Sequence, residues 1–347
     1  MSAAPAVSAE RQTYYDAIAT QNLAPLWERM KGLVANSPKP KSVAAHWRYD
    51  AIRLPLMQAG AMLTTEEAER RVLIIENPGL PGQSRITGSM YAGAQLLMPG
   101  ERARAHRHTA CALRFILEGE GAYTAVDGER TNMKPGDFVI TPSWTWHDHG
   151  NDGDTPVVWL DGLDIAIVNM FDASFSEEYA EEIFPATRPA ADSEIRYTGA
   201  MMPEEIASSS PASPLLNYRW DRARETLDAL LRNGPIDACH GVKLRYTNPR
   251  TGGAVMPTIN ASLQLLPKGF RSTSYRSTDG TVFCVGEGRG HSVVGGTRID
   301  WGHHDLFVVP SWMPVEHEAS EDAVLFSFSD RAAQEKLGIW RQQRGNN

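Results

Sequence analysis

The pattern of hydrophobic and polar residues changes several times along the chain. Residues 9–34 carry apolar side chains at helical spacing, and Pro25 interrupts them, so we expect one or two helices there. Over 84–171, and again over 254–328, short apolar runs alternate with Gly, Pro and Asp-Gly turn signals. Closely spaced short strands of this kind are typical of a β-sandwich or barrel. The pattern therefore predicts two strand-rich regions.

Helical patterns flank and separate these regions. A charged stretch at 64–71, the segment 176–184, the amphipathic segment 220–233 and the polar tail 331–344 all favour helix. The domain organisation predicted from these patterns is a mainly helical N-terminal arm (1–83), a first barrel (84–171), a helical linker (172–250), a second barrel (251–330) and a C-terminal tail helix (331–347).

The two strand-rich regions resemble each other in sequence. Asp137-Phe-Val-Ile-Thr-Pro-Ser-Trp144 aligns without gaps with Asp305-Leu-Phe-Val-Val-Pro-Ser-Trp312. Continuing that register places His149 opposite His317, and His147 opposite Val315. Internal similarity of this kind indicates a duplicated structural unit. We therefore expect a duplicated β-barrel in which one copy has kept chemical groups that the other lacks.

Composition narrows the classes of partner. The 347 residues carry a formal net charge of −8, which disfavours nucleic acid and anionic lipid surfaces. No segment approaches 18 uninterrupted apolar residues, and the N-terminus lacks the pattern of a signal peptide, so we expect a cytoplasmic protein without a membrane partner. The three cysteines are widely spaced and indicate neither a disulfide framework nor a zinc knuckle.

Four of the ten histidines fall within one 44-residue window. His106 and His108 lie two residues apart in an extended segment, so their side chains point to the same face. His147 could meet them across the barrel. Three imidazoles on one face suit Fe, Zn, Ni or Cu and leave coordination positions open for chemistry. His149 shares the strand face of His147 and is the alternative third ligand on position alone.

The spacing of these histidines resembles the two cupin motifs. Gly100-x5-His106-x-His108 fits the first motif, and Gly136-x5-Pro142-x-Trp144-x2-His147-x3-Asn151 fits the second, with Trp144 where glycine is usual. Ala112 stands where many cupins place a glutamate ligand. A site of three neutral histidines keeps the full charge of a divalent metal, which favours an anionic, chelating substrate.

The amino-acid sequence from Gly100 to Asp164, which includes HRHTACALRFILEGEG and ITPSWTWHDHGN, resembles gentisate 1,2-dioxygenases. It also resembles the related salicylate and 1-hydroxy-2-naphthoate dioxygenases. The resemblance implies an all-β bicupin fold, two jelly-roll barrels in one chain, and commonly a homotetramer. It implies one Fe(II) per chain, held by His106, His108 and His147, and cleavage of gentisate with O2 to maleylpyruvate. Tyr275, Ser277 and Val315 stand at the ligand positions of the second barrel, which should be metal-free.

Several further residues are candidates for the first site. Arg114 lies two residues after Ala112 on the same predicted strand, so its side chain should also point into the barrel. There it could bind a substrate carboxylate or form an internal ion pair with Asp161. The resemblance gives His149 a role in hydrogen bonding and proton movement. Asp161 could orient His149 or contact substrate. The remaining pocket candidates, for which core packing is the alternative, are Gln95, Tyr91, Gly93 and Trp144; Arg70 or Arg71 could add a second cation.

Two other functions remain open on the sequence. The substrate could be salicylate or 1-hydroxy-2-naphthoate if the pocket does not require the 5-hydroxyl group of gentisate. Alternatively, the protein could be a cupin that binds or isomerises a small acid without O2, because a metal-site motif alone does not establish an oxygenase.

Overall fold

The computed structural model describes residues 7–204 and 210–345, and the chain falls into two compact units. The first unit ends at Lys39 and holds helices α1 (Ala9–Ala19) and α2 (Leu26–Leu33). The side chain of Ser8 caps α1 by accepting a hydrogen bond from the backbone N–H of Arg11. The expectation of helices over 9–34 is confirmed. The second unit begins at Pro40 and contains both strand-rich regions.

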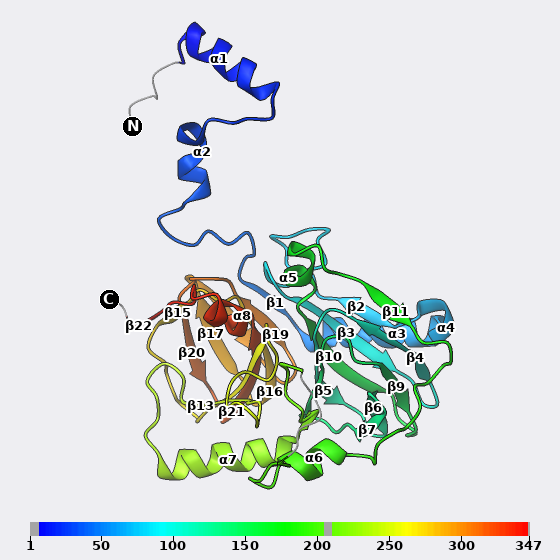
Figure 1. The fold of residues 1–347 in the computed structure, drawn as a ribbon. Coiled ribbons are helices and arrows are strands. Elements are labelled where there is room, and N and C mark those ends of the chain that lie inside the picture. The colour runs from blue at the N-terminus through cyan, green and yellow to red at the C-terminus, as the bar shows by residue number, and fades with distance from the viewer. Residues whose placement is uncertain (1–6, 205–209, 346–347) are drawn as a thin grey trace. The chain divides into compact units, whose positions relative to one another are not determined.

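The first barrel consists of two antiparallel sheets (Figure 1). One sheet has the strand order β12 (Asn217–Tyr218), β8 (Phe138–Thr141), β5 (Ala112–Glu118), β10 (Val157–Leu163), β3 (Tyr91–Leu97) and β2 (Val72–Ile74). The other has the order β11 (Ser176–Glu178), β4 (Arg102–His108), β9 (His147–Asn151), β6 (Ala122–Val126) and β7 (Glu129–Asn132).

The second barrel repeats this plan. One sheet has the order β1 (Ala45–Trp47), β19 (Leu306–Val309), β16 (Thr281–Glu287), β21 (Ala323–Ser329), β14 (Asn260–Leu266) and β13 (Val242–Arg245). The other has the order β18 (Thr297–Trp301), β17 (Gly290–Val294), β20 (Val315–Ala319), β15 (Tyr275–Ser277) and β22 (Gln342–Arg344). The all-β bicupin fold expected from the sequence is confirmed.

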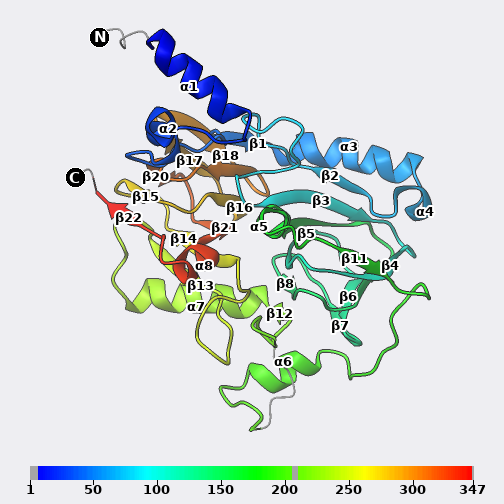
Figure 2. The same cartoon turned by 45° about the horizontal axis from the view of Figure 1, so that its top comes forward.

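The helices of the second unit lie outside the barrels. They are α3 (Tyr49–Met62), α4 (Thr65–Ala68), α5 (Ile165–Met170), α6 (Asp192–Tyr197), α7 (Trp220–Asn233) and α8 (Arg331–Lys336). Helix α3 runs along β2 and β3 (Figure 2). Among the described helices, none combines the length and the apolar character needed to cross a bilayer.

The internal repeat holds in three dimensions. Strands β8 and β19 begin at equivalent residues, and the turn after each places a tryptophan, Trp144 or Trp312, at φ 62°. In the five-stranded sheet of the first barrel, His106 pairs with His147. At the equivalent place in the second barrel, Tyr275 pairs with Val315. The alignment of the two copies therefore matches residue positions in space as well as in sequence.

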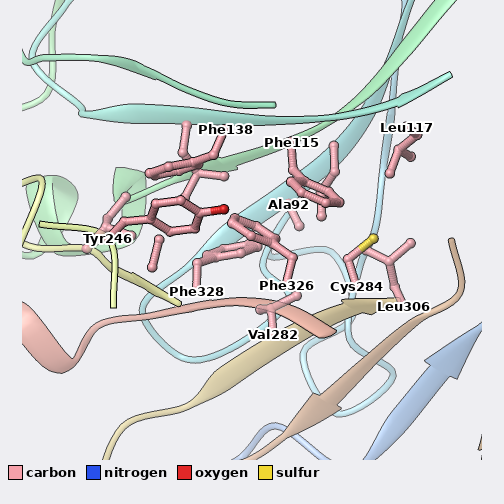
Figure 3. Packing of buried hydrophobic residues seen from close by; sticks show 14 of the residues in the cluster. Ala92, Phe115, Leu117, Phe138, Tyr246, Val282, Cys284, Leu306, Phe326 and Phe328 are labelled. Atoms are coloured by element: carbon pink, nitrogen blue, oxygen red, sulfur yellow. The ribbon is translucent and has the colours of Figure 1, made fainter. Parts of the chain in front are cut away.

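The two barrels pack against each other through the outer faces of their six-stranded sheets (Figure 3). Phe115 of the first barrel stacks on Phe326 of the second, with ring centroids 4.2 Å apart, and Phe138 lies 5.5 Å from Phe326. Both Phe115 and Phe326 are almost fully buried. Burying such large apolar surfaces from both barrels in one core stabilises the pair as a unit.

Two expected helices are corrected by the structure. Residues 176–178 form β11, which pairs with the edge of β4, and 179–184 are irregular. In the tail, α8 ends at Lys336, and β22 then pairs with β15. In both places the open edge of a strand offers backbone hydrogen bonds, and this pairing outweighs a weak local preference for helix.

Both barrels also draw strands from beyond the bounds expected from sequence. Strand β2 comes from the N-terminal arm, and β12 and β13 come from the linker. Strand β1, also from the arm, closes the edge of the second barrel beside β19. Very short strands carry little hydrophobic periodicity, so only their pairing partners reveal them. The domain bounds themselves remain a prediction.

Candidate metal centre

Three histidines meet at one end of the five-stranded sheet of the first barrel. Strand β4 supplies His106 and His108 on one face, and β9 begins with His147, which pairs directly with His106. One ligand nitrogen from each ring lies within 4.8 Å of those of the other two. The structure therefore brings together the three residues that the sequence predicted as metal ligands.

Backbone carbonyl groups fix two of these rings. Nδ1 of His108 lies 2.7 Å from the carbonyl oxygen of Ala110, and Nδ1 of His147 lies 2.9 Å from that of Thr145. A carbonyl oxygen can only accept, so each Nδ1 carries the hydrogen and each Nε2 keeps its lone pair. This is the arrangement in which a neutral imidazole binds a metal through Nε2.

The surroundings keep all three rings neutral. Burial lowers the pKa of His106 to about 2 and that of His108 to about 4, with nearby positive charges acting in the same direction. Burial, together with the other two histidines, also lowers the pKa of His147 well below its usual value. Because only the unprotonated ring can act as a ligand, the three side chains fit a metal ion in their chemistry as well as in their positions.

Arg70 lies beside the triad, in the bend between α4 and β2. Its Nη2 contacts the ring of His106 and donates a hydrogen bond of 3.1 Å to the carbonyl oxygen of Arg104. Burial lowers the pKa of Arg70 to about 10, and the charge of Arg114 adds to the effect. Of the two arginines considered from sequence, Arg70 is the one that reaches this site.

Arg114 is buried on β5 and makes three polar interactions. Nη1 donates to Oγ1 of Thr141 at 2.7 Å, and Nη2 contacts Nε2 of His149 at 3.0 Å. Nε lies 3.5 Å from Oδ1 of Asp161, on the neighbouring strand β10. The internal ion pair considered as an alternative from sequence is therefore present. It occupies the Nε edge of the guanidinium group.

His149 is held between two neighbours. Because Arg114 can only donate, Nε2 of His149 must accept from it, and Nδ1 then carries the hydrogen and donates to Oγ1 of Thr124 at 3.0 Å. Burial lowers the pKa of His149 well below its usual value, and Arg114 adds to this. His149 is thus a neutral ring whose two nitrogens are both engaged, and it fixes the position of Arg114.

Asp161 is buried within the same group. Its Oδ1 accepts a hydrogen bond from Nε1 of Trp159 at 3.0 Å. Burial raises the pKa of Asp161 to about 6, while Arg114 and the Trp159 indole act in the opposite direction. Burial and the charge of Asp161 together raise the pKa of Tyr91. The structure therefore links the carboxylate to Arg114, and it shows no hydrogen bond from Asp161 to His149.

The three candidates on β3 line up on one face of the strand. A Cβ atom at Gly93 would lie 2.7 Å from the hydroxyl oxygen of Tyr91 and 2.6 Å from a methyl carbon of Val72. The space left by this glycine is therefore used by Tyr91 and Val72. Gln95 is buried on the same strand and pairs with Trp159 of β10.

Comparison with known proteins places this arrangement in a family. A cupin domain model matches residues 93–163. The chain is 53% identical over 340 residues to gentisate 1,2-dioxygenase 1 of Aquipseudomonas alcaligenes, covering 98% of both proteins. The chain belongs to the gentisate 1,2-dioxygenase family.

Relatives within and near this family are named for different aromatic acids. A 1-hydroxy-2-naphthoate 1,2-dioxygenase of Nocardioides is 34% identical, over 87% of this chain and 79% of that protein. Among solved structures, a salicylate 1,2-dioxygenase variant of Pseudoaminobacter salicylatoxidans in complex with gentisate superposes with a TM-score of 0.93 at 34% identity, covering 100% of this chain and 98% of that one.

Two residues considered for the dioxygenase site lie elsewhere in this family member. The ring of Trp144 packs on Phe175 and under the guanidinium group of Arg107, which alternation places on the face of β4 opposite the histidines. Arg71 is buried in a two-hydrogen-bond pair with Glu101 at 2.8 Å. Neither side chain is brought into the group around the triad.

The hydroxyl groups that contact two buried histidines, one in each barrel of this dioxygenase family member, were not among the residues predicted from the sequence. Thr124 pairs with His149 across β6 and β9, and in the second barrel Ser292 pairs with His317 in the same way. Oγ of Ser292 lies 2.7 Å from Nδ1 of His317. A hydroxyl group at this position in both copies was the available signal, and extending the repeat alignment to β6 and β17 would have revealed it.

Proposed function

We propose that the protein is a gentisate 1,2-dioxygenase that binds Fe(II) through His106, His108 and His147 and opens the ring of gentisate with O2 to give maleylpyruvate. The observation that carries this proposal is the set of three neutral imidazoles within 4.8 Å, in a chain 53% identical to a gentisate 1,2-dioxygenase over nearly its whole length. Iron(II) bound there would supply one centre at which the aromatic acid and O2 meet and exchange electrons.

The chain's own residues contribute charge and position. Arg114 and Arg70 place two guanidinium groups beside the triad, where they favour an anionic substrate. Arg114 offers the substrate carboxylate a charge-assisted hydrogen bond. Its orientation is fixed by Thr141, His149 and Asp161, so little reorganisation is needed when the acid binds.

His149 and Asp161 act through Arg114 in this proposal. The neutral His149 accepts from the guanidinium group, and the carboxylate of Asp161 balances part of its charge. Tyr91, Gly93 and Gln95 form the wall on β3 from which ring contacts would come. Trp144 supports β4 from its outer face.

The test is oxygen consumption by the protein loaded with Fe(II) under anaerobic conditions. Gentisate, salicylate and 1-hydroxy-2-naphthoate are offered separately, and we expect stoichiometric uptake with gentisate and much slower uptake with the other two. Fast uptake with salicylate would instead favour a salicylate 1,2-dioxygenase, the activity for which the similar gentisate-bound structure is named. No uptake with any acid, despite bound iron, would identify a cupin that is not an oxygenase.

The assembly and location of the enzyme are part of the same proposal. We infer a homotetramer in the cytoplasm, where an enzyme of aromatic acid catabolism would meet its substrate. Light scattering on the purified protein measures the assembly, and a monomeric mass would contradict it.

A further inference from the structure

The second barrel contains a polar cavity where a β-barrel would ordinarily have an apolar interior. Along β14, Asn260, Ser262 and Gln264 alternate with apolar residues and line an inner cavity of about 50 Å³. An outer hollow of about 390 Å³ shares part of this wall, including Lys243 of the neighbouring strand β13. The inner cavity has room for roughly three or four water-sized groups, which is the size of a two- or three-carbon acid.

Polar groups in this wall lack partners among the described residues. Gln264 is fully buried, and neither Nε2 nor Oε1 makes a hydrogen bond. The same is true of Oδ1 of Asn260. Whichever way the Gln264 amide is turned, it presents one donor and one acceptor to the cavity. Buried polar groups without partners are costly, so this wall is suited to a ligand that offers both an acceptor and a hydroxyl donor.

A lysine stands directly beside this amide. Lys243 pairs with Gln264 in the register of β13 and β14, so the two side chains leave the same face. Its ammonium group forms no hydrogen bond or ion pair with any residue in the described part of the chain, while Arg331 pairs with Glu335 and Arg276 bonds to Gln343. Lys243 is therefore the uncommitted cation of the cavity.

The charge around Lys243 suits an anion. Lys243, Arg276 and Arg331 line the inner cavity against one carboxylate, that of Asp279, which is engaged by the indole N–H of Trp340. Lys243 is an exposed residue that reaches the outer hollow, and the protein atoms around its ammonium group lower its pKa to about 8. Arg331 adds to this, and the carboxylates of Asp279 and Asp237 oppose it. The ammonium group thus stays mostly protonated at neutral pH.

The comparison between the barrels supports a ligand held without a metal. Gln264 occupies the position of Gln95, and Lys243 that of Val72, as the two strand registers show. The positions of the three metal-binding histidines carry Tyr275, Ser277 and Val315 instead. The second barrel thus has a fixed positive charge next to the same glutamine, in place of a metal-binding group.

We propose that the second barrel binds a small hydroxycarboxylate, with its carboxylate on Lys243 and its hydroxyl group on Gln264. Asn260 accepts a further hydrogen bond where the ligand has a second donor. The cations at the outer hollow draw the acid toward the cavity. This site is separate from the three histidines of the first barrel and needs no iron.

The test is calorimetric titration of the full-length, iron-loaded protein with glycolate under nitrogen. We expect saturable binding of glycolate that is tighter than binding of acetate, which lacks the hydroxyl group. Lys243→Met and Gln264→Leu should each weaken glycolate binding about tenfold or more, as expected for loss of a hydrogen bond involving a charged or buried group. Lys268→Met, at an exposed lysine of the same barrel outside both cavity walls, should bind glycolate as the parent does.

A second control separates the two barrels. His106→Ala removes a predicted iron ligand and should leave glycolate binding intact, because the proposed site lies in the other barrel. Loss of glycolate binding in His106→Ala would assign the heat to the first barrel and overturn the proposal. Unchanged binding in Lys243→Met, or equal binding of acetate and glycolate, would also overturn it. Thermal melting of Gln264→Leu confirms that the variant is folded before its binding is compared.

Discussion

Replacing Arg114 with methionine separates the structural role of this side chain, seen in its contacts with Thr141, His149 and Asp161, from its proposed role in binding the substrate carboxylate. Methionine keeps most of the apolar stem but removes the positive charge. The carboxylate of Asp161, now 3.5 Å from Nε, would be left buried without its counter-charge. We therefore expect Arg114→Met to lose both thermal stability and affinity for the aromatic acid.

The stability loss can be bounded from the structure. Removing one partner of a buried ion pair costs about 3–5 kcal/mol. The abandoned carboxyl group can instead take up a proton, and because its pKa in the parent is already raised to about 6, this costs only about 1.4 kcal/mol at pH 7. With the hydrogen bonds of Arg114 to Thr141 and His149 lost as well, we expect a loss of about 2–4 kcal/mol, or a melting temperature about 4–10 °C lower.

The sign of the pH dependence follows from the same carboxyl group. Its pKa is already raised to about 6 by burial and rises further without Arg114. A raised carboxyl pKa destabilises the folded state at high pH, and the penalty fades as the pH falls toward the unfolded value. The stability deficit of Arg114→Met should therefore shrink by about 1.4 kcal/mol between pH 7 and pH 5, because the parent carboxyl group also takes up its proton over that range.

A second substitution distinguishes structure from binding. In Arg114→Met/Asp161→Asn the buried group is uncharged, so the melting temperature should largely recover. Affinity for gentisate should not recover, because the proposed carboxylate partner is still missing. That affinity, measured anaerobically by calorimetry on iron-loaded protein, should be about 30- to 150-fold weaker in both variants, equivalent to about 2–3 kcal/mol.

A matched control is available at the other buried arginine pair. Arg71→Met breaks the pair with Glu101 and should lower the melting temperature while leaving gentisate affinity within about twofold of the parent. If the double variant regained affinity together with stability, Arg114 would be acting only as a structural residue. Parent-like affinity in Arg114→Met would refute the assigned contact directly.

Three further predictions concern the packing and the repeat. Phe326→Ala should lower the free energy of unfolding by about 3–5 kcal/mol, measured by denaturant titration, because it empties the centre of the core between the barrels. Gly136→Ala should lower the melting temperature, since φ is +85° and a Cβ atom would lie 2.5 Å from the Trp220 ring; a parent-like melting curve would contradict this. Val315→His should leave the iron content per chain unchanged by elemental analysis, because the other two ligand positions of that barrel lack histidine.

The cluster of three histidines was predictable because its information is local. The His-x-His spacing in an extended segment determines which side chains share a face, and the duplicated Asp-to-Trp segment sets the register of the third histidine. The amphipathic helix at Trp220–Asn233 was predicted for the same reason, since its periodicity covers the whole element. Patterns contained in one or two segments carry these features.

The rest of the site depends on contacts between distant segments. Arg70 reaches His106 from a bend 36 residues earlier, and no local pattern distinguishes it from Arg71. The three partners of Arg114 come from strands 27, 35 and 47 residues further on, and the strand at Ser176–Glu178 exists only because β4 offers an open edge. Such features require the assembled fold.

Arg114 lies deep inside the first barrel, whereas Lys243 lies at the edge of the second, and this difference has a physical reason. Arg114 on the central strand β5 pairs in register with Asp161, whereas Phe283 and Ser327 stand at the equivalent positions of the second barrel. A buried arginine is tolerable when a carboxylate and two hydrogen bonds hold it permanently. A cation that has no such partner must reach water when no anion is bound. Placing Lys243 on the edge strand β13, at the outer hollow, meets that requirement and leaves the ammonium group available to a ligand.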